Sequence, residues 1–147
     1  MNTLADWELH LETLSPPSHI ELDLERVAVV WSRLEQQQPR HVLTVAGTNG
    51  KGSTVETAGL IAQTQGLRYG QDTSPHLHHI HERIRVAGQP VSDDELVAAF
   101  GRVDSARGSV FLTYFEFLTL AALVIFQDHQ LDLWILEIGL GGRLDAV

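Results

Sequence analysis

A glycine-rich segment, residues 47–54, contains Lys51, the one lysine among the ten lysine and arginine residues of this 147-residue chain. Glycines let the backbone approach a phosphate group closely, and the amides at the start of a helix attract its negative charge. Lys51 adds a compact positive charge, and the hydroxyl of Ser53 or Thr54 offers a ligand to Mg²⁺. The segment therefore predicts a phosphate-binding loop. The alternative is a glycine-rich turn that carries an exposed lysine.

The spacing within this loop departs from the strict pattern GxxxxGK[ST]. Val45 stands where that pattern begins with glycine, and Gly52 follows the lysine in place of serine or threonine. An apolar run at residues 41–46 precedes the loop, and a helical pattern at residues 52–65 follows it. Because strand, loop, lysine, hydroxyl and helix occur in the expected order, we retain the phosphate-loop interpretation.

A carboxylate lies within a second apolar run. Glu137 belongs to residues 131–138, where an ionised group is costly unless it is paired or binds a metal. A glutamate at the end of a strand beside a phosphate loop can hold the Mg²⁺ that bridges two phosphates. We favour the metal role. An ion pair, for instance with Arg143, is the alternative.

Four histidines lie close together at positions 76, 78, 79 and 81. On a strand they would form two pairs on opposite faces, and no acid or thiol completes a tetrahedral metal site at this spacing. We therefore expect His78, His79 and His81 to be structural or exposed to solvent.

The composition is that of a globular protein with a net charge of −9. No basic run is present that could follow a nucleic-acid backbone. The absence of cysteine excludes disulfides, thiolate metal sites and cysteine nucleophiles. The longest apolar stretch, residues 117–126, is far shorter than the ~20 residues that span a bilayer, and the first residues do not form a signal peptide. We expect a cytoplasmic protein that binds neither nucleic acid nor membranes.

Helical periodicity alternates with short apolar runs, which is typical of an α/β layer structure. The pattern predicts helices over residues 4–14, 22–38, 52–65, 92–106 and 113–130. It predicts strands over residues 41–46, 67–73, 82–86 and 131–138, the first and last of them buried. We expect a partial parallel sheet flanked by helices, with residues 1–40 as a helical lead-in and residues 41–147 as the α/β core.

Four motifs occur in order at residues 44–54, 74–77 with 82–86, 113–116 and 136–146. Together they resemble the motifs of the folylpolyglutamate synthase and dihydrofolate synthase family, relatives of the Mur peptidoglycan ligases. Glycine after the lysine, together with the strings Ser-Pro-His-Leu and Leu-Gly-Gly-Arg-Leu-Asp, distinguishes this family from the Mur ligases. The resemblance spans nearly the whole chain and implies a P-loop fold of the Mur ligase central-domain type.

The resemblance implies an ATP-dependent amide ligase of folate metabolism with ATP and Mg²⁺ as cofactors. In this family the γ-phosphate of ATP passes to a carboxylate of dihydropteroate or a folate, and the amino group of L-glutamate attacks the acyl phosphate. The implied partners are these small molecules. The family is monomeric, and an exposed apolar edge would favour self-association of this chain.

The resemblance also assigns the site residues. Lys51 and Glu137 would be catalytic, with Lys51 on the β- and γ-phosphates. ATP would contact Thr48, Asn49, Gly50, Lys51, Gly52 and Ser53. Mg²⁺ would bind Ser74, Glu137 and Ser53. The substrate would contact Thr113, Tyr114, Phe115, Leu144, Asp145 and Ala146, and residues 22–26 resemble the pterin-covering region. His76 would shape the Ser74 loop.

Some features depart from the family pattern. Asp23 replaces a glycine, Asp72 places an acid close to the proposed Mg²⁺ site, and histidines follow Leu77. Family members run to roughly three times this length, so a later metal-binding histidine, a carboxylated lysine and the glutamate-side domain have no counterpart. We therefore expect the chain to be inactive alone. The alternatives are a non-catalytic nucleotide-binding remnant or regulatory module, and a generic P-loop kinase.

Overall fold

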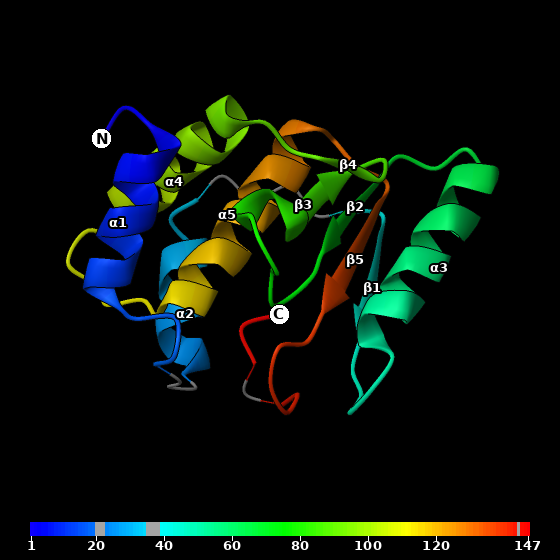
Figure 1. The fold of residues 1–147 in the computed structure, drawn as a ribbon, viewed down its shortest axis with the longest axis horizontal. Helices are drawn as coiled ribbons and strands as arrows, with labels where there is room; N and C mark the ends of the chain where they lie inside the picture. The colour runs from blue at the N-terminus through cyan, green and yellow to red at the C-terminus, as the bar shows by residue number, and fades with distance from the viewer. Residues whose placement is uncertain (20–22, 35–38, 144) are drawn as a thin grey trace. The chain divides into compact units, whose positions relative to one another are not determined.

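The computed structural model describes residues 1–19, 23–34, 39–143 and 145–147. The chain divides into two compact units, whose elements are labelled in Figure 1. One unit comprises Met1–Gln36, Ser92–Ile125 and Ala146. The other comprises Gln37–Val91, Phe126–Asp145 and Val147.

The first unit is helical. It contains α1 (Leu4–Leu14), α2 (Leu24–Trp31), α4 (Asp93–Arg107) and most of α5 (Tyr114–Asp128). α1 and α2 each pack against α4. The ring of Trp7 lies 5.8 Å from that of Phe100 and 6.3 Å from that of Phe117, centroid to centroid. All three side chains are buried, so this aromatic cluster forms part of the unit's core.

Polar side chains explain where two of these helices begin. Thr3 and Asp6 form a reciprocal capping box at α1, and Ser92 and Glu95 form one at α4. Each box supplies partners to backbone N–H groups that have none within the helix. The predicted helix over residues 4–14 and the predicted start of α4 at the Ser92 cap are confirmed.

α2 is shorter than the helix predicted over residues 22–38, and the prediction is wrong for residues 32–34. The helix ends at Trp31, and the Ser32 hydroxyl donates to the carbonyl oxygen of Val29 at 2.7 Å. Such a bond competes with the backbone pattern of a helix. Arg33 then donates from Nη1 to two carbonyl oxygens at the end of α4. Residues 22 and 35–38 of the predicted helix lie outside the described residues.

The second unit is built on a five-stranded sheet with the order β1-β5-β2-β3-β4. The strands are β1 (His41–Val45), β2 (Tyr69–Asp72), β3 (Ile84–Val86), β4 (Gln89–Pro90) and β5 (Leu133–Glu137). β1 and β2 pair in parallel with β5, whereas β3 and β4 continue the sheet in antiparallel pairs. The expected parallel sheet flanked by helices is therefore confirmed for three strands, and the whole sheet is mixed. Ala87 and Gly88, with φ of 50° and 76°, form the left-handed two-residue turn of the β3–β4 hairpin.

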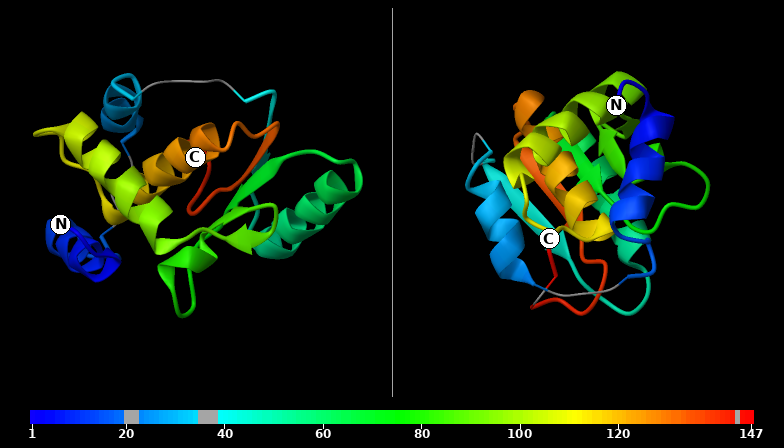
Figure 2. Two further views of the ribbon diagram at one scale, coloured as in Figure 1. Left: turned by 90° about the horizontal axis from the view of Figure 1, so that it is seen from above. Right: turned by 90° about the vertical axis from the view of Figure 1, so that its left-hand side faces the viewer.

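α3 (Lys51–Thr64) follows β1 and lies along one face of the sheet (Figure 2). The core between helix and strands contains Val45, Val55, Ala62, Tyr69 and Ile135. Gly59 allows this close packing, because a methyl group there would lie 2.7 Å from Nε2 of Gln71. That nitrogen donates to the carbonyl oxygen of Val55, which ties β2 to the helix.

β1 is not the buried strand that its apolar residues predicted. Only Val45 is buried, and Val42 and Leu43 are 54% and 40% exposed. The reason is position, since β1 is an edge strand and α3 packs mainly against β5 and β2. β5 lies between β1 and β2 and is buried as predicted.

The remaining elements differ little from their predicted ranges. The strand predicted over residues 82–86 begins at Ile84, because Glu82 ends a short 3₁₀ helix, η1 (Ile80–Glu82). α5 is the most apolar helix and has 15 residues. Within the described parts of the chain, no helix is long and apolar enough to cross a membrane.

Candidate functional site

The glycine-rich loop joins β1 to the start of α3. Its residues 46–50 are exposed, as are Gly52 and Ser53 at the start of the helix. Gly50 precedes α3 with a φ of 77°, a conformation that glycine adopts without steric cost. Because glycine has no side chain to cap the helix, the first backbone N–H groups of α3 stay open to an anion. The loop thus has the form that the sequence predicted.

Lys51 is the first residue of α3, and its side chain folds back over the loop. Its Nζ donates to the carbonyl oxygen of Gly47 at 3.1 Å and lies 3.9 Å from Oε1 of Glu137. The side chain is 18% exposed. The Thr54 hydroxyl donates to the carbonyl oxygen of Gly50 at 2.9 Å, which joins the loop to the first turn of the helix. The positive charge is therefore held at the loop by the chain's own carbonyl and carboxylate groups.

Glu137 ends β5 and lies beside residues that follow the two neighbouring strands. Its side chain is 7% exposed, and Oε2 accepts a hydrogen bond from the backbone nitrogen of Ser74 at 3.2 Å. Lys51 follows β1, and Ser74 follows β2. Because the carboxyl ends of parallel strands lie at one edge of a sheet, these three predicted residues come together. The cation beside Glu137 is Lys51, rather than the Arg143 considered from the sequence.

The groups at this edge suit a magnesium ion that arrives with phosphates. Glu137 supplies a carboxylate, and Ser74 supplies a hydroxyl next to the amide that already contacts it. Mg²⁺ is usually held by one or two carboxylates together with substrate phosphates and water. Among the residues that the structure describes, no three His, Cys, Asp or Glu side chains are grouped to hold a metal by themselves. The donor set therefore fits Mg²⁺ bound jointly with a nucleotide.

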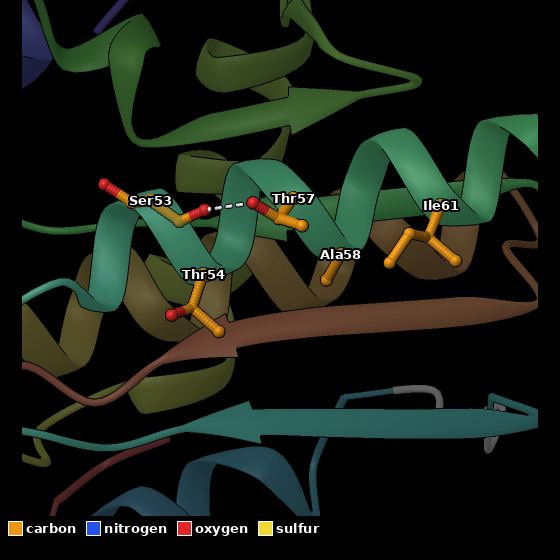
Figure 3. A pocket seen from close by; sticks show the side chains of 5 residues that line it. All are labelled: Ser53, Thr54, Thr57, Ala58 and Ile61. Atoms are coloured by element: carbon orange, nitrogen blue, oxygen red, sulfur yellow. Dashed lines mark hydrogen bonds between the residues drawn. The ribbon is translucent and has the colours of Figure 1, made fainter.

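Ser53 and Thr54 point in different directions from the first turn of α3. In Figure 3, Thr54 and Ile61 extend toward the strands, whereas the Ser53 side chain points away from them. They belong to a groove of about 330 Å³ along the helix, lined by Ser53, Thr54, Thr57, Ala58 and Ile61. The Thr57 hydroxyl donates to the carbonyl oxygen of Ser53, and Ser53 itself is exposed next to the loop.

Asp72 is a buried acid at the same edge of the sheet. Burial raises its pKa to about 7, against the opposing effect of the Arg83 guanidinium and with smaller upward effects of Glu137 and Asp145. All four side chains are buried. The acid that the sequence placed near the proposed metal site is thus close enough to interact with Glu137.

Asp145 holds the loop after β5. Its Oδ2 accepts a hydrogen bond from the backbone nitrogen of Leu140 at 2.8 Å, and Oδ1 accepts one from Val147 at 3.0 Å. The side chain is buried. Ala146 is half-buried, and Leu144 lies outside the described residues. Within this loop, the visible role of Asp145 is to bind backbone amides.

The other substrate candidates lie in the helical unit, at the start of α5. Thr113 and Tyr114 are buried, and Phe115 is half-buried. Glu116, which sequence reasoning left without a role, accepts a hydrogen bond from the backbone nitrogen of Thr113 at 2.8 Å. Its carboxylate also binds Arg26. Glu116 is the last residue of the third motif, at residues 113–116, and this position could have indicated from the sequence that it belongs to the site.

Glu82 is a second residue that sequence reasoning missed. Its carboxylate accepts hydrogen bonds from the backbone nitrogens of Leu77, His78 and His79 at 2.7, 2.9 and 2.9 Å. These three hydrogen bonds, first those from Leu77 and His79, lower the pKa of Glu82 to about 2. Glu82 therefore organises the segment that follows Ser74. His78 and His79 are exposed, as expected, and His81 is half-buried.

Comparisons with known proteins give a consistent result. No model of a known protein family matches the chain. The dihydrofolate synthase/folylpolyglutamate synthase of Escherichia coli (strain K12) is 49% identical over 144 residues, which are 97% of this chain and 34% of that protein. The structure of E. coli FolC in complex with DHPP and ADP has a TM-score of 0.93 and 48% identity, over 99% of this chain and 35% of that one.

A third relative is a bifunctional folylpolyglutamate synthase/dihydrofolate synthase with Mn, AMPPNP and L-glutamate bound. It has a TM-score of 0.91 and 48% identity, over 99% of this chain and 35% of that one. The chain therefore spans about a third of the length of the relatives that it matches.

Replacing Asp72 with asparagine should flatten the pH dependence of stability. An acid whose pKa is raised on folding stabilises the fold fully below its unfolded pKa, and this contribution is lost as pH rises through the folded pKa. Because the pKa of Asp72 rises from 3.8 to about 7 on folding, the free energy of unfolding falls by about 4 kcal/mol across the whole interval between these two pKa values. Urea unfolding at pH 5 and pH 8 should show a smaller loss of stability for Asp72→Asn than for the wild type.

Asp132→Asn is the matched control. Hydrogen bonds from Arg68 lower the pKa of Asp132, so its contribution does not change between pH 5 and pH 8. This variant should keep the wild-type difference between the two pH values. The prediction would be contradicted if the loss of stability between pH 5 and pH 8 were the same in the wild type and in Asp72→Asn.

Proposed function

Because the chain belongs to the dihydrofolate synthase and folylpolyglutamate synthase family, we propose that it forms the ATP-binding part of an ATP-dependent amide ligase of folate metabolism. The observation that carries this proposal is the meeting of Lys51, Ser74 and Glu137 at the ends of three parallel strands. Phosphoryl transfer depends on positioning and charge neutralisation, which a cation, a metal-binding carboxylate and an open helix N-terminus supply.

The proposed reaction has two steps. A carboxylate oxygen of dihydropteroate or a folate attacks the γ-phosphorus of ATP, which forms an acyl phosphate and releases ADP. The amino nitrogen of L-glutamate then attacks the acyl carbon of this acyl phosphate, so that an amide forms and inorganic phosphate is released. The ligands of the solved relatives, ADP or AMPPNP, Mn and L-glutamate, support this choice of substrates. The cysteine-free composition favours a cytoplasmic setting.

The residues divide the work as follows. Lys51 binds the β- and γ-phosphates, and the backbone amides at Gly50, Gly52 and Ser53 surround them. Glu137, Ser74 and Ser53 would hold the Mg²⁺, which would supply positive charge to offset that of the phosphates. Thr113, Tyr114 and Phe115, at the start of α5, contact the pterin ring of the substrate.

Removing the Lys51 amine should weaken ATP binding. Hydrogen bonds to charged groups contribute enough that Lys51→Ala should lower the affinity for MgATP by about tenfold or more. Isothermal titration calorimetry of the chain with MgATP measures this. Arg68→Ala is the control, because it removes an equally positive but 59% exposed side chain that forms an ion pair with Asp132. Equal affinities for wild type and Lys51→Ala would remove the phosphate loop from the proposal.

We further propose that these 147 residues, as a separate polypeptide, bind ATP without completing the ligation, because they span only about a third of the length of the relatives that they match. Incubation with MgATP, dihydropteroate and L-glutamate should therefore give no dihydrofolate, in a sample whose ATP binding is measured in parallel. Glutamate-dependent product would refute this point. Phosphorylated product without an amine acceptor would instead favour the P-loop kinase alternative.

The chain is expected to self-associate through β1. This edge strand exposes Val42 and Leu43, and the adjacent helix exposes Leu60 and Ile61. An unpaired apolar edge is a template for pairing with another strand. Sedimentation velocity should reveal concentration-dependent association that Val42→Lys reduces. Leu9→Lys is the control, because Leu9 is 68% exposed in the other unit. A wild type that stays monomeric at all concentrations would contradict the expectation.

A further inference from the structure

An arginine of α2 binds a glutamate of α5 inside the helical unit. Nε of Arg26 donates to both carboxylate oxygens of Glu116, at 3.0 and 2.9 Å. The two side chains are only 10% and 4% exposed. The Arg26 guanidinium also lies 5.4 Å from the ring centroid of Phe111 and 4.0 Å from Oδ2 of Asp23. The guanidinium is thus held by groups from three segments of the unit.

Glu116 also forms hydrogen bonds at the start of α5. Its Oε2 accepts a hydrogen bond from the backbone nitrogen of Thr113 at 2.8 Å, and its own backbone nitrogen donates to Oγ1 of Thr113 at 3.3 Å. The turn held in this way contains Thr113, Tyr114 and Phe115. A continuous series of contacts therefore runs from Arg26 through Glu116 to the turn proposed to contact the substrate.

Capping alone does not account for this arrangement. At the start of α1, Thr3 and Asp6 form the same reciprocal pattern on the exposed surface. In α5 the pattern is buried, and a charged side chain from another helix reaches it. Burying an ion pair costs desolvation and often adds little stability compared with apolar residues of similar volume. Here the ion pair connects α2 to the turn at the start of α5.

We propose that Arg26 is a positioning residue for the substrate's pterin ring. It acts through Glu116 and orders the turn at residues 113–115 before the ring binds. This inference rests on the proposed function. A flat heteroaromatic ring is bound by groups of fixed orientation, so a loosened turn loses affinity for the ring more than for ATP.

The test uses the variants Arg26→Met, Arg26→Lys and Glu116→Gln, with Arg33→Met as the matched control. Arg33 also belongs to the helical unit, but it donates to carbonyl oxygens at the end of α4. The dissociation constants for dihydropteroate and for MgATP are measured separately by calorimetry, and urea unfolding reports stability. Arg26→Met should weaken dihydropteroate binding by about tenfold. It should leave MgATP binding unchanged.

Arg26→Lys keeps the charge without the planar guanidinium and should restore part of the affinity for dihydropteroate. Arg33→Met should bind dihydropteroate as the wild type does. The inference is overturned if Arg26→Met and Glu116→Gln bind dihydropteroate normally, or if they lose both ligands in proportion to lost stability. A wild type that binds MgATP but no dihydropteroate overturns the folate assignment and the inference with it. Normal wild-type binding with unaffected variants overturns the inference alone.

Discussion

The parallel pairing of β1 and β2 with β5 determines where the candidate catalytic groups lie. In this register Val45 stands opposite Glu137, and Asp72 stands opposite Leu136. The residues that follow β1 and β2 therefore emerge beside the last residue of β5. Lys51 and Ser74 reach Glu137 for this reason, although they are far from it in the sequence. The hairpin of β3 and β4 extends the sheet on the other side without disturbing this edge.

Buried charge at this edge is balanced by short local contacts. Glu137 lies beside Lys51, Asp72 interacts with Arg83, and the oxygens of Asp145 bind backbone amides. A chain with a net charge of −9 thus places its one lysine where carboxylates gather. Phosphates that entered the loop would meet negative as well as positive groups, so a divalent cation that joins phosphate and carboxylate is needed to relieve their repulsion.

Features with local causes could be predicted from the sequence, and those that depend on distant segments could not. Capping residues and periodicity predicted α1 and the start of α4, because both act within one or two turns of a helix. The exposure of Val42 depends on the order of strands, which the apolar run at residues 41–46 does not contain. Glu137 could be predicted as a candidate site residue from its place in an apolar strand. Its partner could not, since the choice between Lys51 and Arg143 depends on how two loops fold back over the sheet.

The register of β5 also limits which insertions and deletions the chain can tolerate. Successive side chains on a strand point to opposite faces, so one residue added between Leu133 and Glu137 would reverse the direction of the carboxylate. The turn before β5 carries no such restriction, because a residue added there leaves the alternation within the strand intact. Length variation among descendants of this sequence should therefore accumulate in the connecting turns and spare the five residues of β5.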